Sequence, residues 1–234
     1  VGGLSVEAVL LASVVPGLLS TFVALLAVRR EPVPAPEDAR DRAARAKVPL
    51  TKPVRGLLAV VGVFSLAVSA ASFLLAYLMH QGLAIRWVPV AWITLQLGKA
   101  LLNAPGGALA DRIGPRRAVL ASWLVYAACY VLFAFSPGPA ATWGLFALYA
   151  VHYGLGEGAE KALLVELCPP EARGRALGLL AAITIALLGA NLIFGGLFGR
   201  DPALAFQVGA TIALAGSALF VVAVPARGPS HQDA

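Results

Sequence analysis

The chain alternates between long apolar runs and short polar connectors. Most of the runs are apolar around the whole helix circumference, so helices built from them would have no polar face to present to water. A helix needs about 20 apolar residues to cross a bilayer. The pattern predicts an all-α membrane protein with seven transmembrane helices, at about Ser5–Val28, Gly56–Met79, Pro89–Ala110, Ala118–Phe135, Ala140–Leu167, Ala176–Phe198 and Ala203–Val224.

Composition supports this prediction. Of the 234 residues, 59% are hydrophobic and 13% are charged, whereas a soluble domain has roughly 45–50% apolar and about 25% charged residues. The net charge of +6 comes from basic residues in the connectors, which are not interleaved with solvent-facing aromatics. The charge therefore indicates membrane orientation and contact with lipid, and no nucleic-acid partner is expected.

The longest connector, residues 29–55, contains several prolines and eight Lys or Arg residues. This composition predicts a flexible linker. The positive-inside rule places the linker in the cytoplasm, and alternating the spans from there puts fourteen Lys or Arg residues inside and two, Arg86 and Arg200, outside. We therefore expect a protein of the inner membrane with its linker and its carboxy-terminal tail in the cytoplasm.

Catalytic and cofactor chemistry find no support in the sequence. The predicted topology separates Cys129 from Cys168 by more than the ~7 Å that a disulfide can bridge between Cα atoms. No strand-turn serine motif or His-rich metal spacing is present. We expect no metal, no cofactor and no catalytic residues. The chain starts with Val1 and lacks a signal-peptide pattern, so we expect it to be a fragment.

A short polar connector interrupts the apolar runs around residues 107–117. Gly114 permits a sharp reversal, and Pro115 suits the first turn of the next helix. The arginines are expected to hold the connector on the cytoplasmic side. The residues that we assign to it as a gating loop are Gly107, Asp111, Arg112, Gly114, Arg116 and Arg117.

The spacing in this connector resembles the cytoplasmic-loop signature of the major facilitator superfamily: a glycine precedes an Asp-Arg pair by four residues, and a second glycine is followed by basic residues. The segments 15–19 and 28–32 also resemble members of that superfamily, and the segments 72–75, 160–162 and 169–178 are similar to a bacterial branch of it. The resemblance covers essentially the whole chain. It implies a secondary transporter that moves a small solute by alternating access.

Members of the superfamily usually have twelve spans, in two six-helix halves joined by a cytoplasmic linker. The resemblance therefore implies that residues 1–28 are the last helix of the amino-terminal half, 29–55 the central linker, 56–225 the carboxy-terminal six-helix bundle and 226–234 the tail. It also implies that Asp111 and Arg112 latch a helix end of the amino-terminal half. Because the substrate site forms between the halves, the chain alone is expected to be inactive and to need the missing half as its partner.

A charged side chain near the bilayer centre costs at least ~2.5–3.5 kcal/mol on insertion scales, so Lys99 needs an explanation. It lies twelve residues before Asp111, or about 18 Å along a helix. Gln96 and Asn103 share its helix face. We predict that this face lines the central substrate cavity; pairing of Lys99 with a neighbouring helix for packing alone is the alternative.

The fifth run contains further polar candidates. Glu157 and Lys161 are spaced for a helical ion pair, so Glu157 is either a structural partner near the cytoplasmic gate or a proton-coupling group. His152 lies near the bilayer centre and is either a packing residue or a titrating one. Further candidates are Glu160 and Arg173 at the cytoplasmic gate and Asn191 in the cavity, and a proton is a possible coupling ion.

A second hypothesis is a non-transporting seven-helix receptor or scaffold. It is weakened because the last run, Ala203–Val224, contains no lysine for a retinal Schiff base, and because the linker after the first run is longer than such bundles need. A membrane enzyme is a third class, which the absence of paired acids facing a cavity argues against.

Overall fold

The computed structural model describes residues 18, 21–23, 25–26, 48–135, 138–186 and 189–225. The chain forms two compact units, Val1–Ala44 and Arg45–Ala234. In the first unit the described residues are helical with exposed side chains. Most of the predicted first span, residues 29–47 of the linker and the tail 226–234 lie outside the described residues.

The regular secondary structure in the described part of the second unit is all helical, as the sequence predicted. It contains two short 3-10 helices, Ile85–Trp87 (η1) and Pro170–Ala172 (η2), and eight α-helices. These are Lys52–Ser65 (α3), Ala71–His80 (α4), Val88–Ile113 (α5), Pro115–Ala134 (α6), Pro139–Leu167 (α7), Arg173–Ala186 (α8), Ala190–Arg200 (α9) and Pro202–Ala223 (α10).

Several of these helices can cross a membrane. Among the described residues, three segments are both long and apolar enough: Pro115–Ala134, Pro170–Arg200 and Pro202–Ala223. The 26 residues of α5 and the 29 of α7 span about 39 and about 44 Å at 1.5 Å per residue, which also exceeds the ~30 Å hydrocarbon core. These two helices carry most of the polar candidates.

The predicted run Gly56–Met79 is two helices and not one. Helix α3 ends at Ser65, and α4 begins at Ala71. Of the run Ala176–Phe198, the structure describes α8 as far as Ala186 and α9 from Ala190. The run Gly56–Met79 is continuously apolar, and hydropathy does not reveal a break within such a run, because it measures burial in lipid and not backbone hydrogen bonding.

The predicted gating loop is also mostly helical. Helix α5 continues to Ile113 and α6 begins at Pro115, so only Gly114 separates them. Gly114 has a φ of +88°, which an L side chain rarely adopts. Asp111, Arg112 and their neighbours are compatible with a helix, and the reversal therefore needs a single glycine.

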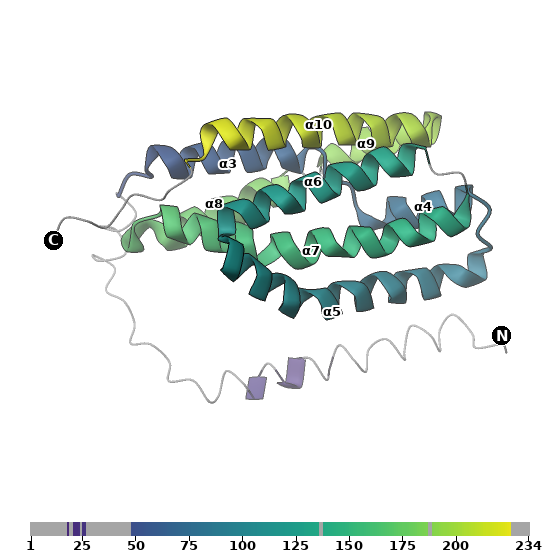
Figure 1. The fold of residues 1–234 in the computed structure, drawn as a ribbon, viewed down its shortest axis with the longest axis horizontal. Helices are drawn as coiled ribbons and strands as arrows, with labels where there is room; N and C mark the ends of the chain where they lie inside the picture. The colour runs from purple at the N-terminus through teal and green to yellow at the C-terminus, as the bar shows by residue number, and fades with distance from the viewer. Residues whose placement is uncertain are drawn as a thin grey trace. The chain divides into compact units, whose positions relative to one another are not determined.

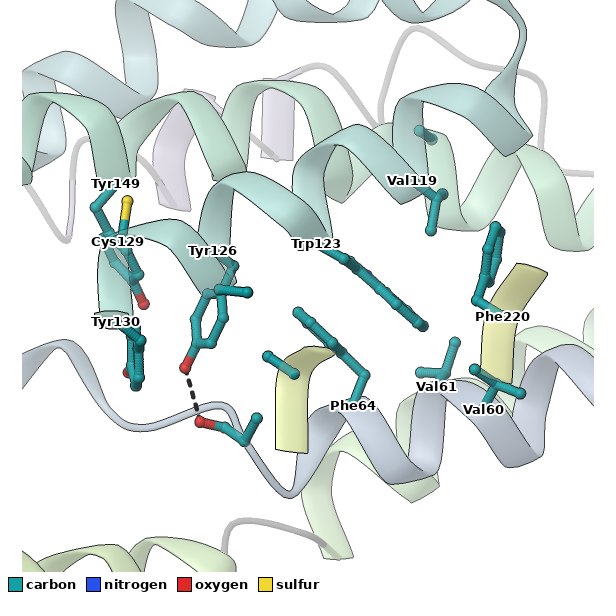
Figure 2. Close-up of a cluster of buried hydrophobic side chains, with 14 of the residues drawn as sticks. Val60, Val61, Phe64, Val119, Trp123, Tyr126, Cys129, Tyr130, Tyr149 and Phe220 are labelled. Atoms are coloured by element: carbon teal, nitrogen blue, oxygen red, sulfur yellow. Dashed lines mark hydrogen bonds between the residues drawn. The ribbon is translucent and has the colours of Figure 1, made fainter. Parts of the chain in front are cut away.

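Helix α6 is central to the second unit. It packs against α7 on one side and α10 on the other, while α3 packs on α10 and α5 on α7; Figure 1 shows α10 beside α3 and α6, and α5 beyond α7. The core along α6 is aromatic. The ring of Trp123 stacks on that of Phe64 with centroids 4.1 Å apart, and Figure 2 shows the two planes side by side.

Helices α5 and α7 approach each other closely at glycines. A Cβ added to Gly154 would lie 2.7 Å from the carbonyl oxygen of Leu102, and one added to Gly106 would collide with the backbone of Gly154. Small residues allow this kind of backbone contact between helices in membranes.

Candidate binding cavity

A cavity of about 700 Å³ lies among α3, α4, α7, α8 and α9. This volume is within the range of ~300–1,000 Å³ that is typical of small-molecule sites. Most of the lining is apolar. The lining residues come from the end of α3, the following connection, the start of α4, the middle of α7, and α8 and α9; the polar and charged ones are Ser65, Ser69, His152, Tyr153, Glu157, Glu160, Lys161, Thr184 and Asn191.

The connection between α3 and α4 forms one wall, and two tyrosines of α6 support it. The Tyr126 hydroxyl donates to the carbonyl of Ala67 at 2.7 Å and accepts from the Ser69 N–H at 3.3 Å. The dashed line in Figure 2 runs from Tyr126 to this connection. The Tyr130 hydroxyl bonds the Ser69 side chain. The Tyr126 hydroxyl thus satisfies backbone groups that the break leaves without helical hydrogen bonds.

Asn191 supports the same wall from α9. Its Oδ1 accepts a hydrogen bond from the Ala70 N–H at 2.7 Å, immediately before the first residue of α4. The sequence singled out Asn191 as a cavity candidate. The structure places it on the cavity lining and shows that its carbonyl oxygen is engaged in holding the helix break.

His152 lies where α6 and α7 contact each other. Its Nδ1 is 2.8 Å from the Ser122 Oγ, and that hydroxyl also donates to the His152 carbonyl at 3.0 Å. A Cβ on Gly156 would collide with the Ser122 hydroxyl. Gly156 therefore leaves the space that lets Ser122 reach His152, whose ring lines the cavity.

Glu160 lies one turn of α7 beyond Gly156, on the same cavity lining. Its Oε1 accepts a hydrogen bond from the indole Nε1 of Trp123 at 2.8 Å. The Trp123 side chain is fully buried and stacked on Phe64. The indole therefore holds the Glu160 carboxylate in a fixed position at the cavity wall.

Glu157 and Lys161 form the ion pair that their spacing predicts. The Lys161 Nζ is 3.7 Å from the Glu157 Oε1, and the two side chains are 62% and 60% exposed. Such an exposed helical pair contributes little to stability, about 0.3–0.5 kcal/mol.

The Lys99 ammonium lies 3.5 Å from the ring centroid of Tyr153, so it joins α5 to α7 through a cation–π contact. Lys99 is partly buried, whereas Gln96 and Asn103 are exposed. These three side chains are not part of the cavity lining. Lys99 adjoins this cavity through Tyr153. That Lys99 lines the central substrate cavity between the two halves of a transporter remains a prediction.

The residues of the predicted gating loop are not brought together at the cavity. Asp111, Arg112 and Arg117 are exposed, and nothing lies within 4 Å of a Cβ placed on Gly107. Arg116 instead hydrogen-bonds the end of α10. Arg173 has exposed surface, and its Nε donates to the Cys168 carbonyl at 3.4 Å.

Sequence reasoning missed Ser122, Trp123, Tyr126 and Tyr130, which supply the partners of the cavity residues. A signal was present, because Trp123, Tyr126 and Tyr130 follow one another at helical spacings of three and four residues on one face of a span. Among the described residues, no group of three or more His, Cys, Asp or Glu side chains could hold a metal ion.

Long apolar helices, with a break between α3 and α4 beside a cavity of small-molecule size, define a helical integral membrane protein with a solute-sized site. The sequence profile described as Major Facilitator Superfamily matches residues 57–234. The chain belongs to this superfamily, whose members are transporters of small solutes and not enzymes.

Two relatives illustrate the similarity. An uncharacterised MFS-type transporter of Methanocaldococcus jannaschii is 27% identical over 220 residues, which cover 90% of this chain and 54% of that protein. The multidrug resistance protein MdtH of Cronobacter sakazakii is 32% identical over 127 residues, which cover 47% of this chain and 32% of that protein. The chain thus spans about half the length of the first relative and a third of the second.

Proposed function

We propose that this chain supplies the carboxy-terminal six-helix half, with the last helix of the amino-terminal half and the central linker, of a secondary active transporter that moves a small solute by alternating access. The observation that carries the proposal is the cavity beside the break between α3 and α4. Discontinuous helices beside a binding site are a feature of secondary transporters, because unwound backbone is tolerated only where it lines a cavity.

In this proposal α3 with α4 forms one span, and α8 with α9 another. With α5, α6, α7 and α10 this makes six, and the segment about 5–28 makes the seventh. The linker and the tail lie in the cytoplasm, as the positive-inside rule suggests. Lys99, Gln96 and Asn103 face the amino-terminal half across the central cavity, and Asp111 with Arg112 forms the cytoplasmic latch.

A proton is the proposed coupling ion. Glu157, Glu160 and His152 are the titratable groups of the cavity lining, apart from Tyr153 and Lys161. If one of these groups binds a proton in one state of the transporter and releases it in the other, solute flux is linked to the proton gradient.

The test is flux in proteoliposomes that contain the protein expressed from its complete coding sequence. An imposed pH gradient should drive the uptake or release of at least one solute from a broad panel, and a protonophore should abolish that flux. Absence of both flux and ligand-dependent thermal stabilisation across the panel would contradict the transport proposal.

The orientation has a separate test. Single cysteines placed at Lys52 and at Arg86, in a variant without Cys129 and Cys168, should differ in labelling by an impermeant maleimide from outside the cell. The proposal expects labelling at position 86 only, and labelling at position 52 would contradict it.

A further inference from the structure

We propose that the cavity binds an organic cation with a mostly apolar body, and that Glu160 neutralises the charge of this ligand. The inference rests on the proposed function, because it names the class of solute that the transporter would carry. It is carried by the charge balance of the cavity, the fixed position of the Glu160 carboxylate and the internal engagement of three other polar groups of the lining.

The charge balance of the lining is negative. Besides His152, the lining contains two carboxylates, Glu157 and Glu160, and one ammonium, Lys161. Glu157 and Lys161 pair with each other. Glu160 has no ion pair within 4 Å in the part of the chain that the structure describes. One unpaired carboxylate beside apolar walls favours a positive ligand, because charges interact more strongly away from water.

The Glu160 carboxylate is positioned and one of its oxygens is available. Oε1 accepts from the indole of Trp123, which is itself fixed by burial and by stacking on Phe64. Oε2 accepts no hydrogen bond from the described residues. A carboxylate held in this way loses little side-chain entropy when a cation binds to its second oxygen.

Three further polar groups of the lining are committed to the fold. The Ser69 hydroxyl bonds Tyr130, the Thr184 hydroxyl donates to the carbonyl of Leu180, and the Asn191 carbonyl oxygen accepts from Ala70. A sugar or another polyhydroxylated solute needs many free hydrogen-bonding partners, so this lining suits it poorly. The remaining walls are apolar side chains, including the aromatic ring of Phe64, which suit an apolar body and can contact a cation.

The test uses tetraphenylphosphonium, a permanent cation with an apolar body, and triphenylphosphine oxide as its neutral counterpart. Binding of each radiolabelled probe is measured separately by equilibrium dialysis with the detergent-purified protein from the complete coding sequence. We expect wild-type protein to bind the cation at least tenfold more tightly than the neutral probe. Equal affinity for the two probes would overturn the proposal.

The Glu160→Gln variant removes the charge but keeps an oxygen that can accept from Trp123. We expect it to weaken binding of the cation at least tenfold, and Glu160→Asp to retain part of the affinity. The matched control is Glu166→Gln, the same change at an exposed residue of α7 outside the cavity, with an expected change below threefold. A change below threefold in Glu160→Gln would overturn the proposal.

If Glu160→Gln fails to fold, as judged by gel filtration, the comparison of the two probes on wild-type protein decides alone. Flux assays separate this inference from the proposed function. Charge-selective binding without flux supports the cation site and contradicts transport. Flux of a neutral or anionic solute without binding of tetraphenylphosphonium supports transport and overturns the cation site.

Discussion

The guanidinium of Arg116, in the first turn of α6, caps the end of α10 at Val224. Its Nε donates to the Val224 carbonyl at 3.1 Å, and its Nη2 donates to the Val221 carbonyl at 3.2 Å. The last carbonyls of a helix have no donors within the helix, and a cation there also complements the helix dipole. Arg116, which the sequence assigned to a gating loop, thus has its partners within its own helical unit.

We therefore expect Arg116→Met to destabilise the protein. The loss of hydrogen bonds from a charged donor should cost about 1.5–3 kcal/mol. Thermal unfolding in detergent measures the effect. Arg117→Met, at the exposed neighbouring position, should change stability by less than about 0.5 kcal/mol. Equal thermal unfolding midpoints for the two variants would mean that the contact of Arg116 with α10 contributes nothing to stability.

The tyrosines at the α3–α4 break allow a second prediction. Tyr126→Phe removes the hydroxyl that serves both Ala67 and Ser69. Because the groups left behind are buried, we expect a loss of about 1–3 kcal/mol. Denaturant-induced or thermal unfolding followed by tryptophan fluorescence provides the measurement.

Tyr149→Phe is the matched control for Tyr126→Phe. Tyr149 is also fully buried, but within the described residues its hydroxyl has no hydrogen-bond partner. Removing an unsatisfied hydroxyl should be neutral or slightly stabilising. A larger loss in Tyr149→Phe than in Tyr126→Phe would argue against the role that we assign to Tyr126.

The close contact of α5 with α7 supplies a third prediction. Gly154→Ala forces a methyl group against the backbone of Leu102, at 2.7 Å. Overpacking of this kind typically costs about 1–3 kcal/mol. Gly158→Ala lies one turn further along α7 with nothing within 4 Å of the added methyl group, so it should preserve or raise stability. The difference in thermal midpoint between these two variants is the measurement.

Lys99 provides the fourth prediction, which depends on the proposed cavity role. Lys99→Met should reduce solute flux in proteoliposomes at least tenfold, while the loss of the contact with Tyr153 should lower stability by only about 0.5–2 kcal/mol. Lys99→Arg keeps a cation over the ring and should retain stability. Unchanged flux in Lys99→Met would leave Lys99 with a packing role alone.

Helix content and membrane character could be predicted from the sequence, because both depend on local composition. The helix ends near Ile113, Pro115 and Leu167 lie within a few residues of the predicted ones. The break after Ser65 could not be predicted. It depends on partners distant in the chain, Tyr126 and Asn191, which bond the connection after α3.

The candidate site shows the same division. His152, Glu160 and Asn191 stood out because polar side chains in apolar runs are costly. Their hydrogen-bond partners were missed, because nothing in the sequence pairs Trp123 with Glu160 or Ser122 with His152. The partner of Glu160 is 37 positions away in the sequence, and a linear pattern contains no information about that contact.

By itself the sequence determined that the chain lies in a membrane, that it is helical and which family it resembles. The first of these could be determined because the free energy of placing apolar side chains in lipid is nearly additive along the chain. Only the tertiary structure decided which polar groups are already satisfied and which remain available at the cavity. Hydrogen bonding depends on distances of about 3 Å between residues, and packing of α6 against its neighbours sets those distances. Glu160 and Asn191 illustrate this difference: among the described residues the Glu160 Oε2 accepts no hydrogen bond, whereas the Asn191 Oδ1 already accepts one from Ala70.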